Sequence, residues 1–305
     1  MAYSNVARVS SATPSSDKSA STKQSSELGV RSEASKCHTR SARKCTALQL
    51  LAIRKSDAAT EPLAQKNAFT TAADRWSKVI VGDLPSVNVD GEVIDDLLIM
   101  AQGVPIDGPG GILGQAGPTH LRPASAGAAA FLPVKGIMSF DTADLAQMQA
   151  DGTLKDVITH EMGHVLGIGT VWARKGKLKG AGTNNPRFTG AGAKTEFGKL
   201  KHSAAAEVPV ENTGGQGTRD GHWRESVFRN ELMSGFIAAP NNPMSRMTVA
   251  SLKDLGYDVD LAKAEPYTLP DLFALAAAGA PATTHEQPHA LPVIPMVMPD
   301  SSLVE

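Results

Sequence analysis

The 305-residue sequence has few cysteines, almost no net charge and no long apolar run. Its two cysteines, Cys37 and Cys45, both precede the region that has the composition of a folded domain. That domain therefore cannot contain disulfides or thiolate ligands, and a metal site in it would use histidine and carboxylate side chains. The formal net charge of −1 gives no electrostatic argument for binding nucleic acid or an acidic membrane surface. No apolar stretch approaches the roughly 20 residues of a membrane-spanning helix, so we expect no transmembrane segment.

Residues 1–45 also lack large apolar side chains and are rich in serine and basic residues. Such a composition cannot bury enough surface to offset the entropy of ordering, so we predict a disordered N-terminal segment. The segment has no continuous apolar stretch of the kind found in a secretory signal. Two alternatives stay open: an organelle transit peptide, and a segment in which Cys37 covers a metal and keeps an enzyme latent.

Apolar periodicity and turn residues predict an α+β fold for the rest of the chain. The strands come first and the helices follow, without the βαβ alternation of a Rossmann sheet. We expect strands at 48–53, 96–102, 111–116 and 134–140, and amphipathic helices at 67–80 and 248–255. The chain is accordingly divided into an N-terminal subdomain over 46–167, a loop-rich C-terminal subdomain over 168–280, and a proline-rich tail over 281–305 that we expect to fray.

The most informative motif is the pentapeptide from His160 to His164, in which Glu161 follows the first histidine. Histidines four residues apart share one face of a helix, so both can reach a zinc ion at about 2.0–2.1 Å. Glu161 is offset around the helix and can reach a zinc-bound water without becoming a ligand. The pattern therefore predicts a catalytic zinc site.

The simpler interpretation is a surface helix whose histidines are merely solvated. The neighbouring residues argue against it, because apolar side chains recur at helical spacing and would anchor the helix in a core. These side chains belong to Leu154, Val157, Ile158, Met162 and Val165. Thr153 and Asp156 resemble a capping box at the start of the helix, and Gly167 is a typical stop.

A catalytic zinc needs three protein ligands and one open position. In the compact arrangement the third histidine would stand at position 170, which is Thr170 here. His222 is followed by Trp223 and lies eleven residues before Met233, in a Glu-Leu-Met-Ser-Gly segment. The other histidines are His38, His120, His202, His285 and His289. A carboxylate ligand from Glu225 or Glu231 remains the second possibility.

At these motifs the sequence resembles the leishmanolysin family of metzincin proteases. The resemblance runs from the Phe-Thr-Thr-Ala-Ala-Asp-Arg-Trp segment at 69–76 to Ser-Leu-Lys-Asp-Leu-Gly-Tyr at 251–257, and includes the segments 111–118 and 132–141. It implies that His160, His164 and His222 hold one catalytic Zn²⁺, that Glu161 is the general base, and that Met233 is the Met-turn residue beneath the metal. It also implies a metzincin-type fold: a mixed twisted N-terminal sheet, a long backing helix, the zinc-binding helix, and a loop-rich C-terminal part with the Met-turn and one last helix.

The resemblance implies a zinc-dependent endopeptidase that acts on protein or peptide substrates. An alternative is a non-catalytic, zinc-stabilised adhesion or binding module, which would keep the histidines but would not need Glu161. A zinc hydrolase of another amide is a third possibility. The cysteine-free domain looks more like the lean bacterial relatives than like the disulfide-rich, surface-anchored protozoan members. The family implies an extracellular or secreted location, although no signal peptide is visible, and we expect a monomer.

We expect an extended substrate to add as a strand to an exposed sheet edge, since backbone hydrogen bonds give affinity that tolerates many sequences. The edge predicted for this role is Ile112, Leu113, Gly114, Gln115 and Ala116. Pro118 is expected to end it.

Overall fold

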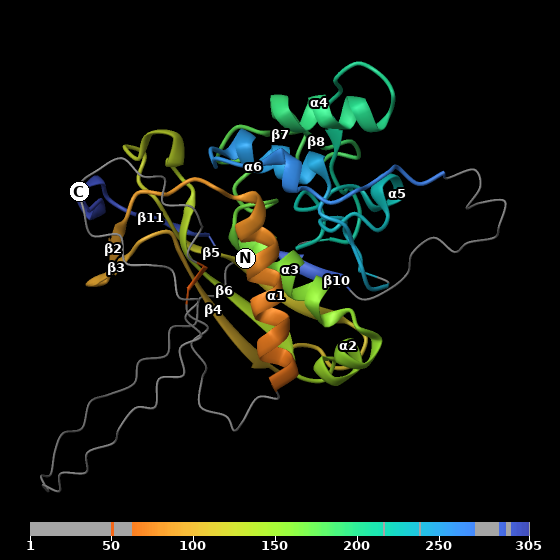
Figure 1. Cartoon of the computed structure of the whole chain (residues 1–305), viewed down its shortest axis with the longest axis horizontal. Helices are drawn as coiled ribbons and strands as arrows, with labels where there is room; N and C mark the ends of the chain where they lie inside the picture. Colours follow the sequence, from red (N-terminus) through yellow and green to blue (C-terminus); the bar gives the residue numbers. More distant parts are fainter. Residues whose placement is uncertain are drawn as a thin grey trace, which may run out of the picture.

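The computed structural model describes residues 50–51, 63–215, 217–237, 239–271, 287–290 and 294–304. The predicted N-terminal disorder, both cysteines and most of the strand expected at 48–53 lie outside the described residues. The described part is a mixed α+β structure (Figure 1). None of its helices has the length and apolar character needed to cross a membrane.

The main sheet is mixed and contains the segments closest to the predicted motif. Its order is β1 (Leu50–Leu51), β4 (Leu97–Val104), β6 (Pro133–Asp141), β5 (Ile112–Leu121) and β10 (Gln287–Ala290), and β11 (Met296–Val297) also pairs with β5. Strands β1, β4 and β6 run parallel, β5 is antiparallel to β6, and both β10 and β11 run parallel to β5. A separate hairpin pairs β2 (Val87–Val89) with β3 (Glu92–Ile94).

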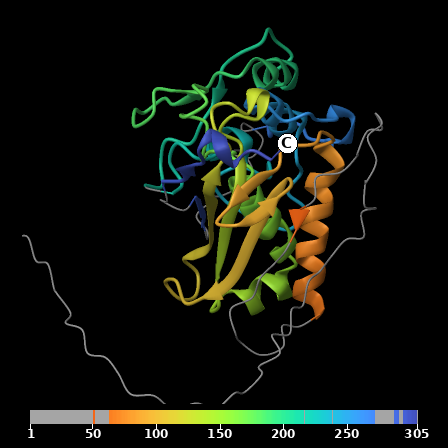
Figure 2. The same cartoon turned by 90° about the vertical axis from the view of Figure 1, so that its left-hand side faces the viewer.

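Two helices cover one face of this sheet (Figure 2). Helix α1 (Leu63–Val79) buries Trp76, whose indole N–H donates to the carbonyl of Thr159 at 2.9 Å, and so ties α1 to α3 (Leu154–Val165). The predicted apolar positions of α3 are all buried. The short α2 (Leu145–Asp151) precedes α3, and Gly152, in the left-handed conformation, separates the two.

The C-terminal part consists of short elements joined by long loops. Strands β7 (Leu178–Lys179), β8 (Arg187–Phe188) and β9 (Val208–Pro209) form a small sheet, and helices α4 (Ala191–Leu200), α5 (Glu225–Phe228) and α6 (Arg246–Leu255) lie around it. Helix α6 is the predicted last helix, and it ends at Gly256 as expected. Single-turn helices occupy Gly127–Ala129, Leu261–Lys263 and Asp300–Ser302.

Three expectations were wrong. Pro118 does not end β5, which continues to Leu121 through a register shift between Pro118 and His120. The predicted open edge at 112–116 is covered, because β10 pairs with it. The expectation that residues 281–305 fray fails for their last part: the Met298 N–H donates to the carbonyl of Leu121 at 2.9 Å, so this part of the tail adds to the sheet.

The predicted capping box at the start of α3 is also absent. Thr153 is the N-cap residue, but its side chain makes no capping hydrogen bond. The carboxylate of Asp156 instead accepts from the guanidinium of Arg75 at 2.8 Å and from the backbone N–H of Asn241 at 2.5 Å. A buried carboxylate forms stronger hydrogen bonds with a cation than with the neutral N–H groups of its own helix, so the tertiary contact takes precedence.

Candidate metal centre

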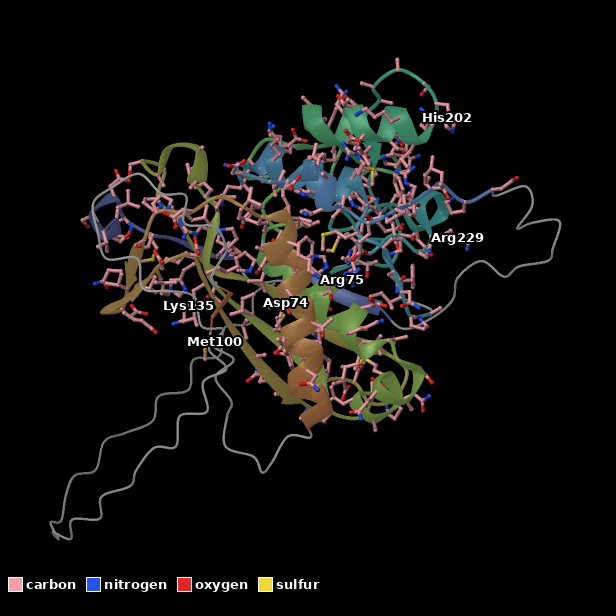
Figure 3. All side chains as sticks on the ribbon, in the orientation of Figure 1. Asp74, Arg75, Met100, Lys135, His202 and Arg229 are labelled. Carbon is pink, nitrogen blue, oxygen red and sulfur yellow. The ribbon has the colours of Figure 1, made fainter. Side chains whose placement is uncertain are left out.

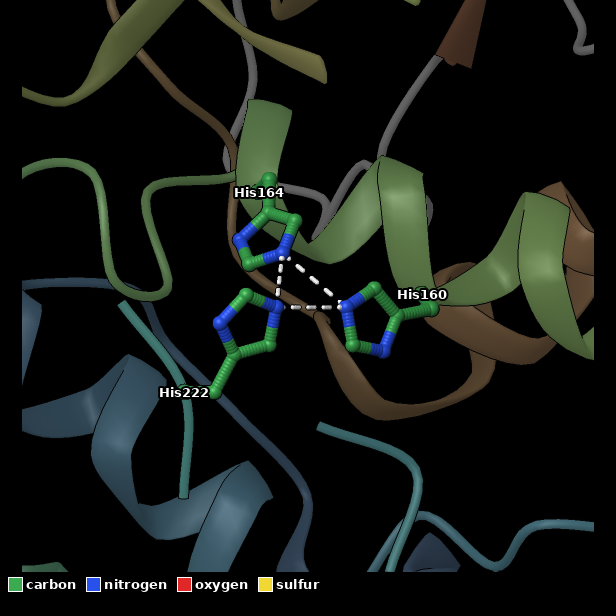
Figure 4. Close-up of side chains that lie close together, drawn as sticks. All are labelled: His160, His164 and His222. Atoms are coloured by element: carbon green, nitrogen blue, oxygen red, sulfur yellow. Dashed lines mark hydrogen bonds between the residues drawn. The ribbon is translucent and has the colours of Figure 1, made fainter. Parts of the chain in front are cut away.

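Three imidazole rings from two distant segments meet at one point (Figure 4). The Nε2 atoms of His160 and His164, on α3, lie 3.0 Å apart, and the Nε2 of His222 lies 3.1 Å from the first and 2.9 Å from the second. All three side chains are fully buried. Two nitrogens bound tetrahedrally to one zinc ion at 2.0–2.1 Å are separated by about 3.3 Å, so the triangle is close to the size that such an ion requires.

The other nitrogen of each ring fixes its tautomer. Each Nδ1 lies near a backbone carbonyl: the carbonyl of Leu232 at 2.6 Å for His160, of Ile168 at 2.9 Å for His164, and of Thr218 at 2.8 Å for His222. A carbonyl oxygen can only accept, so each Nδ1 carries the proton and each Nε2 presents a lone pair. Three lone pairs directed at one point repel one another unless a cation lies between them, and this arrangement therefore fits a metal.

The electrostatics agree with this protonation. Burial, followed by the neighbouring rings of His164 and His222, holds the pKa of His160 well below its usual value. The imidazole is therefore neutral at physiological pH, which is the state that binds a metal.

Glu161 follows His160 on α3 and is fully buried, and its carboxylate has no hydrogen-bond partner among the described residues. Burial raises the pKa of this carboxyl well above its usual value. A Cβ atom built at Gly114 would lie 3.1 Å from a carboxylate oxygen of Glu161, so glycine at this position lets β5 pass close to this carboxylate. A buried carboxylate without partners is costly, and such a group marks a place where a polar ligand is expected.

Glycines bring the His222 loop to α3. After α3, Gly169 adopts a left-handed conformation with φ of 77°, and a Cβ built there would lie 2.0 Å from the carbonyl oxygen of Gly221. The residue before His222 can therefore lie against this turn only because position 169 has no side chain. Thr170, at the compact third-ligand position, donates its hydroxyl hydrogen to the carbonyl of His164 at 2.7 Å and so ties this turn to the end of the helix.

Met233 lies against α3 at Gly163. A Cβ built at Gly163 would lie 2.6 Å from the Met233 sulfur, so the thioether fills the space that this glycine leaves. The backbone of the turn also supports the loop, because the N–H of Trp223 donates to the carbonyl of Met233 at 2.9 Å. His222 and the predicted Met-turn are thus parts of one hydrogen-bonded unit.

The carboxylate alternatives do not meet the rings. Among the described residues, His222 is the one residue whose side chain is placed to share a metal with His160 and His164; no cysteine, aspartate or glutamate of the described part joins this group. Glu231 is buried, and its carboxylate accepts from the Met233 N–H at 2.7 Å and the Ser245 hydroxyl at 2.6 Å. It therefore serves as a structural acceptor. His202 is exposed just after α4 (Figure 3), as expected of a surface histidine.

Two supporting groups were missed from the sequence. Arg75 of α1 (Figure 3) joins Asp156 of α3 to the C-terminal loops, since its guanidinium also donates to the carbonyl of Asn242 at 2.7 Å and to the carboxylate of Glu265 at 2.8 Å. The second is Glu211, whose carboxylate accepts from the backbone N–H groups of residues 212, 213 and 225 at 2.8–2.9 Å. Arg75 and Asp156 are 81 residues apart and Glu211 reaches Glu225 across 14 residues, and no local pattern in the sequence indicates contacts of that range.

Comparison with known proteins agrees with these features. The sequence profile of the leishmanolysin family matches residues 84–271, which is more than half of the chain and includes all three histidines. Leishmanolysin from Leishmania donovani is 28% identical over 145 residues, which cover 44% of this chain and 24% of that protein. The chain thus matches about a quarter of the length of this relative. On the strength of the family match, the chain belongs to the leishmanolysin family of metallopeptidases.

Proposed function

We propose that this protein is a zinc-dependent endopeptidase in which His160, His164 and His222 hold the metal and Glu161 is the general base. The observation that carries the proposal is the convergence of three Nε2 lone pairs within 2.9–3.1 Å of one another, with every Nδ1 engaged by a backbone carbonyl. The family supports a metallopeptidase and protein substrates. The identity of the metal, the ligands and the base are our proposal.

A zinc ion held in this way supplies Lewis-acid polarisation of the scissile carbonyl and makes water acidic enough to attack near neutral pH. The protein's own groups do the rest. Glu161 accepts a proton from the attacking water and delivers it to the leaving nitrogen. The Glu161 carboxylate is buried and has no hydrogen-bond partner among the described residues, which favours this role. Burial raises its pKa, so the carboxylate binds a proton more readily than an exposed glutamate does.

The carbonyls of Leu232, Ile168 and Thr218 hold the three rings in orientation and in the metal-binding tautomer. The Met233 side chain packs against Gly163 of α3. We propose that Met233 belongs to the family's Met-turn, and that the three histidines would hold the metal between an N-terminal subdomain over 46–167 and a C-terminal subdomain over 168–280. On this proposal the α+β fold is of the metzincin type.

We further propose that substrates pair with β5 over Ile112 to Ala116, the edge that β10 occupies in this structure. Gly114 supports this, because it brings the strand within contact of Glu161. A peptide paired there would run past the general base. Because the family is generally extracellular or attached to cell surfaces, we also propose that the substrates are proteins outside the cell.

The test combines metal analysis with a casein digest. The wild type is expected to contain one zinc per chain, to lose cleavage on chelation and to recover it when zinc is returned. Glu161→Gln should retain zinc and lose cleavage by about 10²–10⁴-fold. Glu207→Gln, which alters an ion pair with Lys179 on the surface, is the matched control and should cleave normally.

Mass spectrometry of the digest separates the alternatives. Cuts within the casein chain are expected from an endopeptidase. Retained zinc with no internal cut in the wild type would contradict the proposal in favour of a non-catalytic binding module or a hydrolase of another amide.

A further inference from the structure

Two segments near the C-terminus lie along the same edge of β5 (Figure 1). In β10, Pro288 pairs with Gly114 and Ala290 with Ala116. In β11, Met296 pairs with His120. Both segments run parallel to β5, with β10 along its first half and β11 at its end.

The first segment lies beside the proposed base. Pro288 of β10 is the register partner of Gly114, and a Cβ at Gly114 would lie 3.1 Å from a carboxylate oxygen of Glu161. Strand β10 also contacts α3, the helix that bears the base. It therefore occupies the part of the edge where a substrate would have to pair for cleavage.

The second segment is firmly attached. The N–H of Met298 donates to the carbonyl of Leu121 at 2.9 Å, and the N–H of Val304 donates to the carbonyl of Ser86 at 3.0 Å. Met298 and Ser302 are buried. Because β11 begins only a few residues after β10, this anchor keeps β10 near β5 at a high effective concentration even when the pairing opens.

The pairing of β10 is short, and its register is irregular between Gln287 and Pro288. It covers four residues, and Pro288 has no N–H to donate. Few backbone bonds therefore hold β10, and a longer peptide with a donor at every residue can compete with it. One sheet edge accepts only one strand at a time, whichever direction that strand runs.

We propose that residues 287–290 are a built-in competitor for the substrate, an intramolecular strand that must leave β5 before a peptide can bind. The proposal rests on the proposed function, since it takes β5 as the substrate edge. The anchor at 296–304 sets how often β10 returns to β5. The apparent association constant for peptides is therefore the intrinsic constant multiplied by the fraction of molecules in which β10 has left β5.

The test locks and releases β10 in the full-length protein. Ala116→Cys with Ala290→Cys places two thiols at register partners. Neighbouring strands bring Cα atoms to about 5 Å, within the range that a disulfide spans. Cys37 and Cys45, the two native cysteines, are replaced by serine, and Glu161→Gln prevents turnover. The probe is a fluorescein-labelled casein fragment, and binding is read as fluorescence anisotropy.

We expect the oxidised protein to bind the fragment at least about tenfold more weakly than the same protein after reduction. Ala290→Cys alone is the matched control and should show no dependence on oxidation. Equal affinity of the oxidised and reduced double variant would overturn the proposal.

A second variant leaves β5 in its native sequence. His289→Pro with Ala290→Pro, made in the Glu161→Gln parent, leaves residues 288–290 of β10 without a backbone N–H donor. This variant should bind the fragment about tenfold more tightly than the parent. Hydrogen exchange at the amides of 112–116 should become faster in the same variant, which confirms that β10 has left. Faster exchange without tighter binding would overturn the proposal.

These measurements separate the two proposals. Binding is read in a variant that cannot cleave, whereas the proposed function is tested by cleavage in the wild type. Binding that responds to β10 without any cleavage by the zinc-loaded wild type would overturn the proposed endopeptidase and leave the competition standing.

Discussion

The two halves of the candidate metal centre are held in different ways. His160, Glu161 and His164 lie on α3, where the helical repeat sets their spacing and apolar packing sets their direction. His222 and Met233 lie on loops, where no repeating hydrogen-bond pattern exists. Buried carboxylates take its place: Glu211 accepts the backbone N–H groups of residues 213 and 225, on both sides of His222, and Glu231 accepts those of Met233 and Ser245.

The difference shows how a loop can reach the precision of a helix. A helix satisfies its own backbone groups, whereas a buried loop must satisfy its N–H groups with side chains. A carboxylate with two oxygens accepts several donors at once and fixes their relative positions. The loop half should therefore depend on single buried side chains, and the helix half should not. The following variants test this from the largest expected effect to the smallest.

The first comparison removes one ligand from each half. His164→Ala and His222→Ala should each weaken zinc binding by more than about 100-fold. Removing only the hydrogen-bond partner of a metal ligand already costs up to about 100-fold, and the loss of the ligand itself should cost more. Zinc affinity is measured by competition with a chromophoric chelator. His202→Ala, at an exposed position, is the control and should bind normally. Wild-type affinity in His222→Ala would show that the loop half does not hold the metal.

The second removes an internal support of the loop half. Glu231→Ala should lower the free energy of unfolding by about 3 kcal/mol, because buried donors at Met233, Ser245 and Thr248 lose their acceptor. Denaturant unfolding measures the change. Glu207→Ala removes only a surface ion pair and should cost at most about 1 kcal/mol. Similar costs for the two variants would contradict the dependence on a single buried carboxylate.

The third alters the approach of the two halves. Gly169→Ala should lower the free energy of unfolding by about 2–4 kcal/mol, because the new methyl group meets both an unfavourable positive φ and the carbonyl of Gly221. Gly176 also has a positive φ, of 64°, but open space around it, so Gly176→Ala should show only the conformational cost of about 1–2 kcal/mol. Thermal unfolding of both variants compares them. Equal effects would mean that the loop adjusts to the contact.

The fourth variant lies outside the candidate metal centre, at Asp141 at the end of β6, where a carboxylate also accepts backbone N–H groups of a loop. Hydrogen bonds from the backbone N–H groups of residues 143 and 107 contribute most to lowering the pKa of Asp141. A lowered pKa in the folded state means that Asp141 stabilises the protein above the unfolded value of about 4 and that this stabilisation disappears as pH falls through the folded value. Asp141→Asn should therefore lower Tm at neutral pH, and the difference from wild type should shrink below pH about 4. A difference independent of pH would contradict this origin.

Much of the helix half was predictable, because its signals are local. The 3.6-residue repeat placed the apolar face of α3, and the separation of His160 from His164 placed both rings on one side. In the helix predicted at 67–80, the apolar side chains of Ala72, Trp76, Val79 and Ile80 are likewise buried, although α1 begins earlier, at Leu63, and ends at Val79. His222 was singled out because of family resemblance, since nothing in its own neighbourhood indicates that its ring reaches α3.

The wrong expectations share a physical cause. Asp156 was taken for a helix-capping residue, but Arg75 and the backbone at Asn241, both distant in the chain, claim its carboxylate. Pro118 was expected to end a strand, but a register shift lets β5 continue past it. In both cases a contact between distant segments overrode a local preference that is worth only about 1 kcal/mol.

The sequence by itself determined the chemistry that is available: two histidines at helical spacing, a glutamate beside them, and a region of folded composition without cysteine. The tertiary structure alone decided which loop closes the metal centre and which strand covers β5. The physical reason is range. Helical spacing is set by bonds between residues four apart, whereas the partners of Glu211, Asp156 and β5 are chosen by burial and hydrogen bonding across the whole fold.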